Sequence, residues 1–133
     1  MNNISQLSVP TPPARNYIEY IETKIRNKHT EQTIKKDPIE VGDIIRIGYL
    51  IPEGDKERTQ YYEGLIISVS NRGLGRTFTL RRTVQNIGME QIFVLNSPKI
   101  VSIIKKQSSK VRRAKLYFMR HLKGKATRLK VKL

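Results

Sequence analysis

Five short apolar segments follow one another between residues 44 and 104, each bounded by a turn-forming stretch. In the first, Ile45, Ile47 and Tyr49 alternate with other side chains, as a strand with one buried face requires. The other four span residues 61–70, 76–84, 90–95 and 100–104. Five short strands at this spacing predict a mainly β fold, a small antiparallel barrel that closes its own edges. About 65 residues are then enough for a modest core.

The turns between these segments are rich in residues that favour positive φ. The stretch 71–75 contains two glycines, and a further turn is expected at 86–88. In the strand between them, alternation puts Phe78 and Leu80 on the buried face and Arg81 on the polar face, beside two threonines.

On both sides of the strand region, the apolar residues recur at a helical spacing instead of alternating. Ile18, Ile21 and Ile25 recur on one helical face, which predicts a short helix over residues 17–28 with Asn16 as its N-cap. Residues 1–15, with three prolines, are expected to form an irregular arm. The chain thus divides into an N-terminal arm with a short helix (1–37), a β domain (38–105) and a C-terminal extension (106–133).

The C-terminal extension also has a helical pattern. Val111, Ala114, Phe118 and Leu122 fall on one stripe, which predicts a helix that begins near Ser109. A glycine at position 124 is placed to end that helix, and a second short helical segment is expected after it. Such short helices are unstable alone, and their charge favours disorder in the absence of a partner.

Charge is distributed very unevenly along the chain. The formal net charge is +15, from 26 basic and 11 acidic side chains. Residues 1–63 have nine basic and ten acidic side chains, whereas residues 64–133 have seventeen basic side chains and Glu90 as their only acid. From Lys105 onward there are twelve Lys and Arg and no acid. A solvated protein face normally mixes both signs, so this half predicts a polyanionic partner, most simply a nucleic acid.

The predicted contacts to RNA form two groups. One surrounds the turn at 71–75 and the strand after it, and the other is the extension, where an aromatic ring could also stack on an unpaired base. The residues are Arg72, Arg76, Arg81, Arg82, Lys105, Lys106, Lys110, Arg112, Arg113, Lys115, Tyr117, Arg120, Lys123, Lys125, Arg128 and Lys130.

Several other chemistries find no support in the sequence. There is no Cys, and His29 and His121 are far apart, so we expect neither a disulfide nor a metal site. No apolar run approaches the ~20 residues of a membrane span, and the first residues lack the features of a signal or transit peptide. The Gly124-Lys-Ala-Thr127 stretch lacks the spacing of a phosphate-binding loop. We expect no cofactor, no small-molecule substrate and no catalytic residue.

Ordered motifs over residues 38–130, about seven tenths of the chain, resemble the bacterial and plastid family of large-subunit ribosomal protein nineteen. These are Val41-Gly-Asp43, Glu53-Gly54 with Lys56, Arg58 and Gln60, Glu63-Gly64, Asn71-Arg-Gly-Leu-Gly75 with Thr77-Phe-Thr79, Gly88 with Glu90 and Phe93, Ser97-Pro98, Arg112-Arg-Ala-Lys-Leu-Tyr117, Arg120, and Gly124-Lys-Ala126. Residues 1–37 are longer than the usual bacterial N-terminus.

The resemblance implies an SH3-like barrel with basic extensions and a structural role in the large ribosomal subunit. It implies contacts to large-subunit rRNA, to ribosomal proteins fourteen and three, and to small-subunit rRNA through an intersubunit bridge. Seventeen Ile against three Ala suit an AT-rich genome. With the added N-terminal helix, this favours a plastid ribosome in the chloroplast stroma, with the bacterial cytoplasm as the alternative.

Two other functions remain open from the residues alone. A free architectural protein that acts on DNA or mRNA would bind duplex DNA comparably well and would not co-sediment with ribosomal subunits in high salt. A basic RNA nuclease would need a near-neutral base, for which His29 and His121 are the only candidates.

Overall fold

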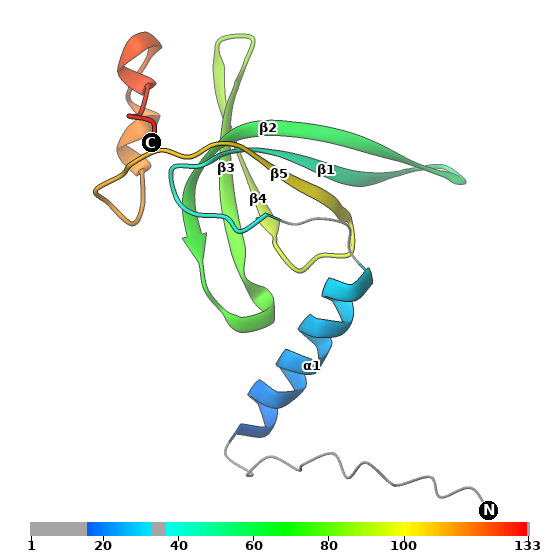
Figure 1. Ribbon diagram of the computed structural model, residues 1–133. Coiled ribbons are helices and arrows are strands. Elements are labelled where there is room, and N and C mark those ends of the chain that lie inside the picture. Colours follow the sequence, from blue (N-terminus) through cyan, green and yellow to red (C-terminus); the bar gives the residue numbers. More distant parts are fainter. Residues whose placement is uncertain (1–15, 33–36, 133) are drawn as a thin grey trace, which may run out of the picture.

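The structure is a computed structural model that describes residues 16–32 and 37–132, and its body is a single antiparallel sheet (Figure 1). The five strands are β1 (Ile44–Glu53), β2 (Lys56–Ser70), β3 (Thr77–Val84), β4 (Ile87–Val94) and β5 (Ile100–Gln107), in the order β4-β3-β2-β1-β5. All five predicted strands are confirmed, and the fold is mainly β. The expected irregular arm, residues 1–15, lies outside the described residues.

The sheet curls around one apolar core. Phe93 of β4 and Ile100 and Ile103 of β5 belong to the same buried cluster, although their strands are the two edges of the sheet. The Phe93 ring also lies 5.7 Å from the ring of Tyr49 on β1, centroid to centroid. Phe78 and Leu80 are buried in this core, as alternation predicted.

The prediction that the sheet closes its own edges is wrong for the described residues, because no ladder joins β4 to β5. The chain between these strands forms a turn with two local bonds, Ser97 N–H to Val94 O (3.1 Å) and Ile100 N–H to Ser97 O (3.2 Å), and further backbone bonds join it to Leu50 and Arg76. The two edges therefore meet through side chains in the core and not through hydrogen bonds.

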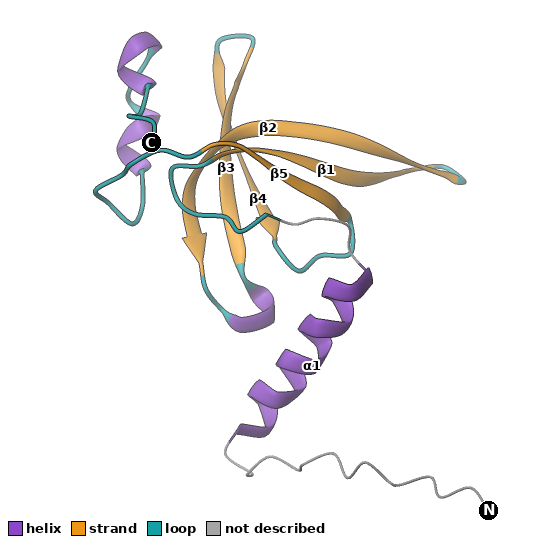
Figure 2. Cartoon of the chain, viewed as in Figure 1, coloured by secondary structure: helices purple, strands orange, loops and turns teal. Residues whose placement is uncertain are grey.

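Two hairpins extend beyond the sheet (Figure 2). β1 pairs with β5 only as far as Tyr49, so the β1–β2 hairpin continues alone to its tip. β3 pairs with β2 only as far as Arg81, and the β3–β4 hairpin likewise continues alone. Its turn is formed by Gln85 and Asn86, both at positive φ, and not by residues 86–88 as predicted. A two-residue turn with positive φ at both positions matches the twist of a hairpin.

The predicted N-terminal helix is confirmed as α1 (Tyr17–Gln32), which is longer than expected. It stands beside the sheet near the turn between β2 and β3 (Figure 1). The Glu22 carboxylate lies against Gly73 of that turn. Its predicted apolar face stays exposed: Ile18, for example, is 76% accessible.

The predicted helix in the C-terminal extension is wrong. The described part of that segment has only two 3₁₀ turns, η3 (Tyr117–Arg120) and η4 (Gly124–Thr127). Gly124 has φ +61° but begins η4 instead of ending a helix. The predicted stripe is not buried either, since Phe118 is exposed, whereas Leu116 and Met119 are buried. A spacing of three residues fits the shorter period of a 3₁₀ turn.

A second apolar cluster fixes the extension to the back of the sheet. Leu116 and Met119 pack on Ile67 of β2, and Leu116 N–H donates to Ile67 O at 2.8 Å. The chain then returns on itself: Lys110 N–H donates to Lys130 O, and Lys132 N–H to Ser108 O, both at 2.8 Å. The structure thus shows a docked loop where disorder was expected.

Candidate nucleic-acid interface

The extension presents a row of cations to solvent. Each of the following is exposed and has no acidic partner within the described ranges: Lys106, Lys110, Arg112, Arg113, Lys115, Lys123, Lys125, Arg128 and Lys130. The backbone that holds them is itself paired and packed on β2, so the charges are presented on an ordered loop. Such an arrangement can neutralise several phosphates of one polyanion.

Aromatic rings lie under some of these cations. The Arg113 guanidinium is 5.2 Å from the centroid of the Phe118 ring, and Lys115 Nζ is 5.9 Å from that of Tyr117. Tyr117 O–H also donates to Ser68 Oγ at 3.4 Å. These contacts orient long side chains that would otherwise sample many rotamers.

Glu90 organises the junction between β3, β4 and the extension. Arg120 holds it with two hydrogen bonds, Nε to Oε1 at 2.7 Å and Nη2 to Oε2 at 2.8 Å, and Arg81 Nη1 donates to Oε1 at 3.1 Å. The hydrogen bond from Arg120, more than its charge or that of Arg81, lowers the pKa of Glu90. The same hydrogen bond raises the pKa of Arg120. Two predicted RNA contacts are therefore already engaged inside the protein.

Lys105 is half-buried, and its charge is paired with a buried carboxylate. Its Nζ is 2.9 Å from Oδ2 of Asp43, whose side chain is 1% accessible. Asp43 also accepts hydrogen bonds from Glu40 N–H (2.9 Å) and Ser108 Oγ (2.8 Å). The carboxylate thus joins the start of β1 to the end of β5.

The predicted arginines on β3 and its preceding turn do not form one patch. Arg72 is exposed beside η2 (Gly73–Gly75), with Arg76 half-buried next to it, at the end of the sheet near α1. Arg81 and Arg82 lie further along β3, toward the extension. Arg82 stacks on the ring of Tyr62, 4.7 Å from its centroid. The structure therefore brings Arg81 and Arg82 together with the extension and leaves Arg72 and Arg76 on a separate surface.

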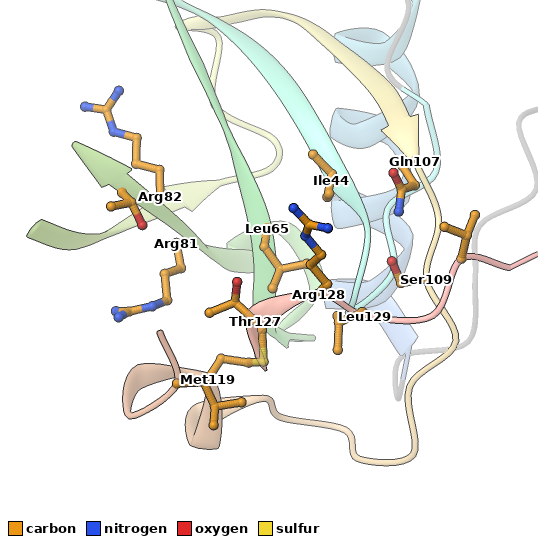
Figure 3. Close-up of a pocket in the computed structure, with 13 residues that line it drawn as sticks. Ile44, Leu65, Arg81, Arg82, Gln107, Ser109, Met119, Thr127, Arg128 and Leu129 are labelled. Atoms are coloured by element: carbon orange, nitrogen blue, oxygen red, sulfur yellow. The ribbon is translucent and has the colours of Figure 1, made fainter. Parts of the chain in front are cut away.

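A pocket of about 520 Å³ opens between the sheet and the extension (Figure 3). Leu65, Met119 and Leu129 form apolar walls, and Arg81, Arg82 and Arg128 stand around it. Sequence reasoning missed this pocket because its walls come from β1, β2, β3 and the extension. It also missed the role of Glu90, for which the one signal was its position as the sole acid among residues 64–133.

Two kinds of site are absent from the described part of the chain. No group of three His, Cys, Asp or Glu side chains could hold a metal ion there. Among the same residues, no helix is long and apolar enough to cross a membrane.

Comparison with known proteins identifies the family. The family model for ribosomal protein L19 matches residues 19–132. The large ribosomal subunit protein bL19c of Trieres chinensis is 50% identical over 107 residues, which cover 80% of this chain and 89% of the relative. The bL19c of Phaeodactylum tricornutum is 54% identical over 99 residues, 73% of this chain and 82% of the relative.

A bacterial relative matches over a longer part of the chain. The large ribosomal subunit protein bL19 of Parasynechococcus marenigrum is 46% identical over 124 residues, 92% of this chain and 79% of the relative. With the basic loop docked on its sheet, and with matches of this length and identity, the chain belongs to the ribosomal protein L19 family of structural, non-enzymatic constituents of the large ribosomal subunit.

Proposed function

We propose that this protein binds ribosomal RNA by phosphate neutralisation through its C-terminal extension. The observation that carries the proposal is the row of exposed cations without acidic partners on an ordered loop. Cations that no internal acid neutralises repel one another in the free protein, and packed phosphates remove that repulsion.

The surface divides into two parts. The extension, with Arg81 and Arg82 beside it, forms the larger contact surface, and Arg72 and Arg76 form a second one near α1. Lys105 belongs to the set only through the exposed part of its side chain, because its charge is already paired with Asp43. A protein with two separated basic surfaces can hold two RNA segments at a fixed spacing.

We further propose that the curled sheet is an SH3-like barrel left partly open. The strand order with β5 beside β1, and a core shared by both edge strands, support this. The division into 1–37, 38–105 and 106–133 then corresponds to an arm, a barrel that holds the basic surfaces in register, and the main RNA-binding loop.

Location and neighbours follow from the family resemblance. We propose a place near the subunit interface, with large-subunit proteins fourteen and three as neighbours and a bridge to small-subunit rRNA. The two plastid-type bL19c relatives described above support a plastid ribosome in the chloroplast stroma, and the bacterial bL19 relative keeps the bacterial cytoplasm as the alternative.

The contact surface can be tested with a triple variant, Arg112→Ala, Arg113→Ala and Lys115→Ala. These side chains are exposed, so the variant should remain folded. RNA affinity at low salt should fall, and the slope of log K against log salt should decrease by roughly two to three, because each phosphate contact contributes about 0.7–0.9.

A matched variant with Lys56→Ala and Arg58→Ala removes cations from the tip of the β1–β2 hairpin instead. It should leave the salt slope unchanged. An unchanged slope in the triple variant would show that the extension is not the contact surface.

Association with the ribosome can be tested separately. The tagged protein should remain with large subunits through a high-salt sucrose gradient, because several phosphate contacts and apolar packing act together. Release into the free fraction, with equal affinity for duplex DNA, would favour the architectural alternative.

A further inference from the structure

A second hollow, of about 620 Å³, lies within the C-terminal extension, which supplies all the residues that line it. Its cations are Lys110, Arg112, Arg113, Arg128 and Lys130. In the part of the chain that the structure describes, none of these five forms an ion pair, and no acidic residue lines the hollow. Unpaired positive charges gathered around one hollow repel one another, so they favour an anionic occupant.

The same hollow has an apolar and aromatic lining beside its cations. The residues that complete the lining are Val111, Leu116, Phe118 and Leu129. Leu116 and Met119 pack on the sheet, whereas Phe118 lies outside that cluster and stays 37% accessible. The Arg113 guanidinium lies 5.2 Å from the centroid of the Phe118 ring. A ligand that fits the hollow therefore combines negative charge with a group that packs on an aromatic ring.

The neighbouring ring of Tyr117 is comparably accessible but less suited to such a ligand. Two cations lie over it, with Arg120 at 4.6 Å and Lys115 at 5.9 Å from the ring centroid. The charge of Arg120 is already neutralised by Glu90. Tyr117 is also not part of the lining of the hollow. Of these two rings, Phe118 is therefore the one that stands among unpaired cations.

We propose that this hollow holds one unpaired RNA base, stacked on Phe118, while the five cations bind the phosphates on either side of that base. The proposal rests on the function proposed above and deepens it, because it names an unpaired nucleotide as the part of the RNA that the extension selects. Proteins recognise single-stranded RNA by stacking its bases on aromatic rings and on Arg guanidinium planes. A base on Phe118 would extend the stack that Arg113 and Phe118 already form.

Other occupants satisfy only one part of the hollow. A continuous RNA duplex would bring phosphates to the cations, but its bases would stay inside the helix and out of reach of Phe118. An acidic protein segment would neutralise the cations, but its carboxylates would not stack on the ring. An apolar side chain would cover the ring and would leave five charges partly desolvated without a counter-charge. An unpaired nucleotide supplies both the charge and the flat base.

The affinity of the full chain for two matched RNAs can test the proposal. The first RNA is a short hairpin with a single bulged adenosine, and the second is the same hairpin with an abasic ribose at the bulge. Both have the same phosphates, so the salt dependence of binding should be the same. The RNA with the bulged base should bind about tenfold more tightly, since stacking of one base on an aromatic side chain has this effect. Fluorescence anisotropy in increasing salt measures both quantities.

Phe118→Leu should remove this preference for the bulged base and should keep the salt dependence. Phe118→Tyr, which keeps an aromatic ring, should retain the preference. Tyr61→Leu is the matched control, because Tyr61 is also exposed and has the Arg46 guanidinium 4.4 Å from its ring centroid, but lies on β2 away from the extension. It should bind both RNAs as the parent chain does. Circular dichroism of each variant reports whether the fold is retained.

Methyl NMR of the parent chain gives a second readout that needs no variant. The ring current of a bound base should shift the methyl signals of Val111 and Leu129, which line the hollow with Phe118. The hairpin with the bulged adenosine should produce these shifts, and the abasic hairpin should not.

Equal affinities of the parent chain for the two RNAs would overturn the proposal, as would equal methyl shifts with both. It also fails if folded Phe118→Leu keeps the full preference, or if Tyr61→Leu loses it too. If salt-dependent binding to both RNAs persists in these cases, the proposed phosphate-binding function stands and only the base site fails. A parent chain that binds neither RNA would contradict the proposed function itself, and the base site with it.

Discussion

At the scale of single residues, two carboxylates hold the basic half of the chain in place. Asp43 is buried and fixes the end of β5 through Lys105 and Ser108. Glu90 is partly accessible and fixes the extension through Arg120. Burial makes the hydrogen bonds of Asp43 more consequential, since a buried donor left without its acceptor cannot turn to water.

Asp43→Asn should lower the free energy of unfolding by about 2 kcal/mol. The amide cannot neutralise Lys105 and offers one acceptor oxygen to donors that now use two. Urea denaturation monitored by circular dichroism measures the change. Asp55→Asn at the tip of the β1–β2 hairpin is the exposed control and should change stability little; equal effects of the two would contradict the role of Asp43.

Glu90→Gln should remove a pH dependence of stability. Because Arg120 lowers the pKa of Glu90, the carboxylate stabilises the folded chain above its ordinary pKa of 4.5. That contribution is lost as the pH falls through the lower folded-state pKa. Thermal unfolding of the parent and the variant should therefore differ at neutral pH and converge in acid. A constant difference across this range would show that the ion pair does not stabilise the fold.

At the scale of elements, one glycine of β2 allows β2 and β3 to approach closely where the sheet curls. A Cβ placed on Gly64 would lie 2.5 Å from the carbonyl oxygen of Arg81 on β3. The register between β2 and β3 shifts just beyond this point, between Ile66 and Ser68. The close approach of the two backbones and the irregular register together bend the sheet over its core.

Gly64→Ala should therefore lower the free energy of unfolding by about 1–3 kcal/mol. The added methyl group would clash with the backbone of β3 unless that strand moved away. Gly75→Ala is the matched control. Its φ is not positive and its added Cβ would meet only Arg72 Cβ at 3.9 Å, so stability should hardly change. Guanidinium unfolding of both variants tests this; a neutral Gly64→Ala would place the origin of the curl elsewhere.

The elements differ in how far sequence could predict them. The strands were predictable because alternation in residues such as Phe78 and Leu80 reports a buried face directly. The extension was not, because Val111, Ala114, Phe118 and Leu122 match a helical period without enough neighbouring apolar surface to stabilise a helix. Its conformation depends on the packing of Leu116 and Met119 on Ile67, a residue that is distant in sequence.

The residue types of the candidate site could be predicted from the sequence, but their positions relative to one another could not. A run of cations without acids predicts a polyanion-binding surface, whatever conformation the run adopts. Which cations are internally paired, as Lys105 and Arg120 are, depends on contacts with Asp43 and Glu90 that no local pattern reports. The pocket of Figure 3 depends on four segments meeting in space.

At the scale of the whole molecule, the net charge of +15 opposes folding in the absence of RNA. Added salt should raise the Tm of the free protein, because screening of many repulsive pairs outweighs the weakening of a few exposed ion pairs. Differential scanning calorimetry in increasing sodium chloride measures this. A Tm that falls with salt would mean that the ion pairs at Glu90 and Glu53 dominate over repulsion.

The extension doubles back on itself, with backbone hydrogen bonds between Lys110 and Lys130 and between Ser108 and Lys132. This arrangement has a thermodynamic consequence for assembly. A loose chain would lose most of its conformational entropy at the moment it met RNA, and that loss would weaken the complex. In this fold the entropy is lost earlier, when the protein folds. If RNA binds the extension as proposed, it meets a loop that is already folded, and assembly then depends mainly on the motions of the RNA.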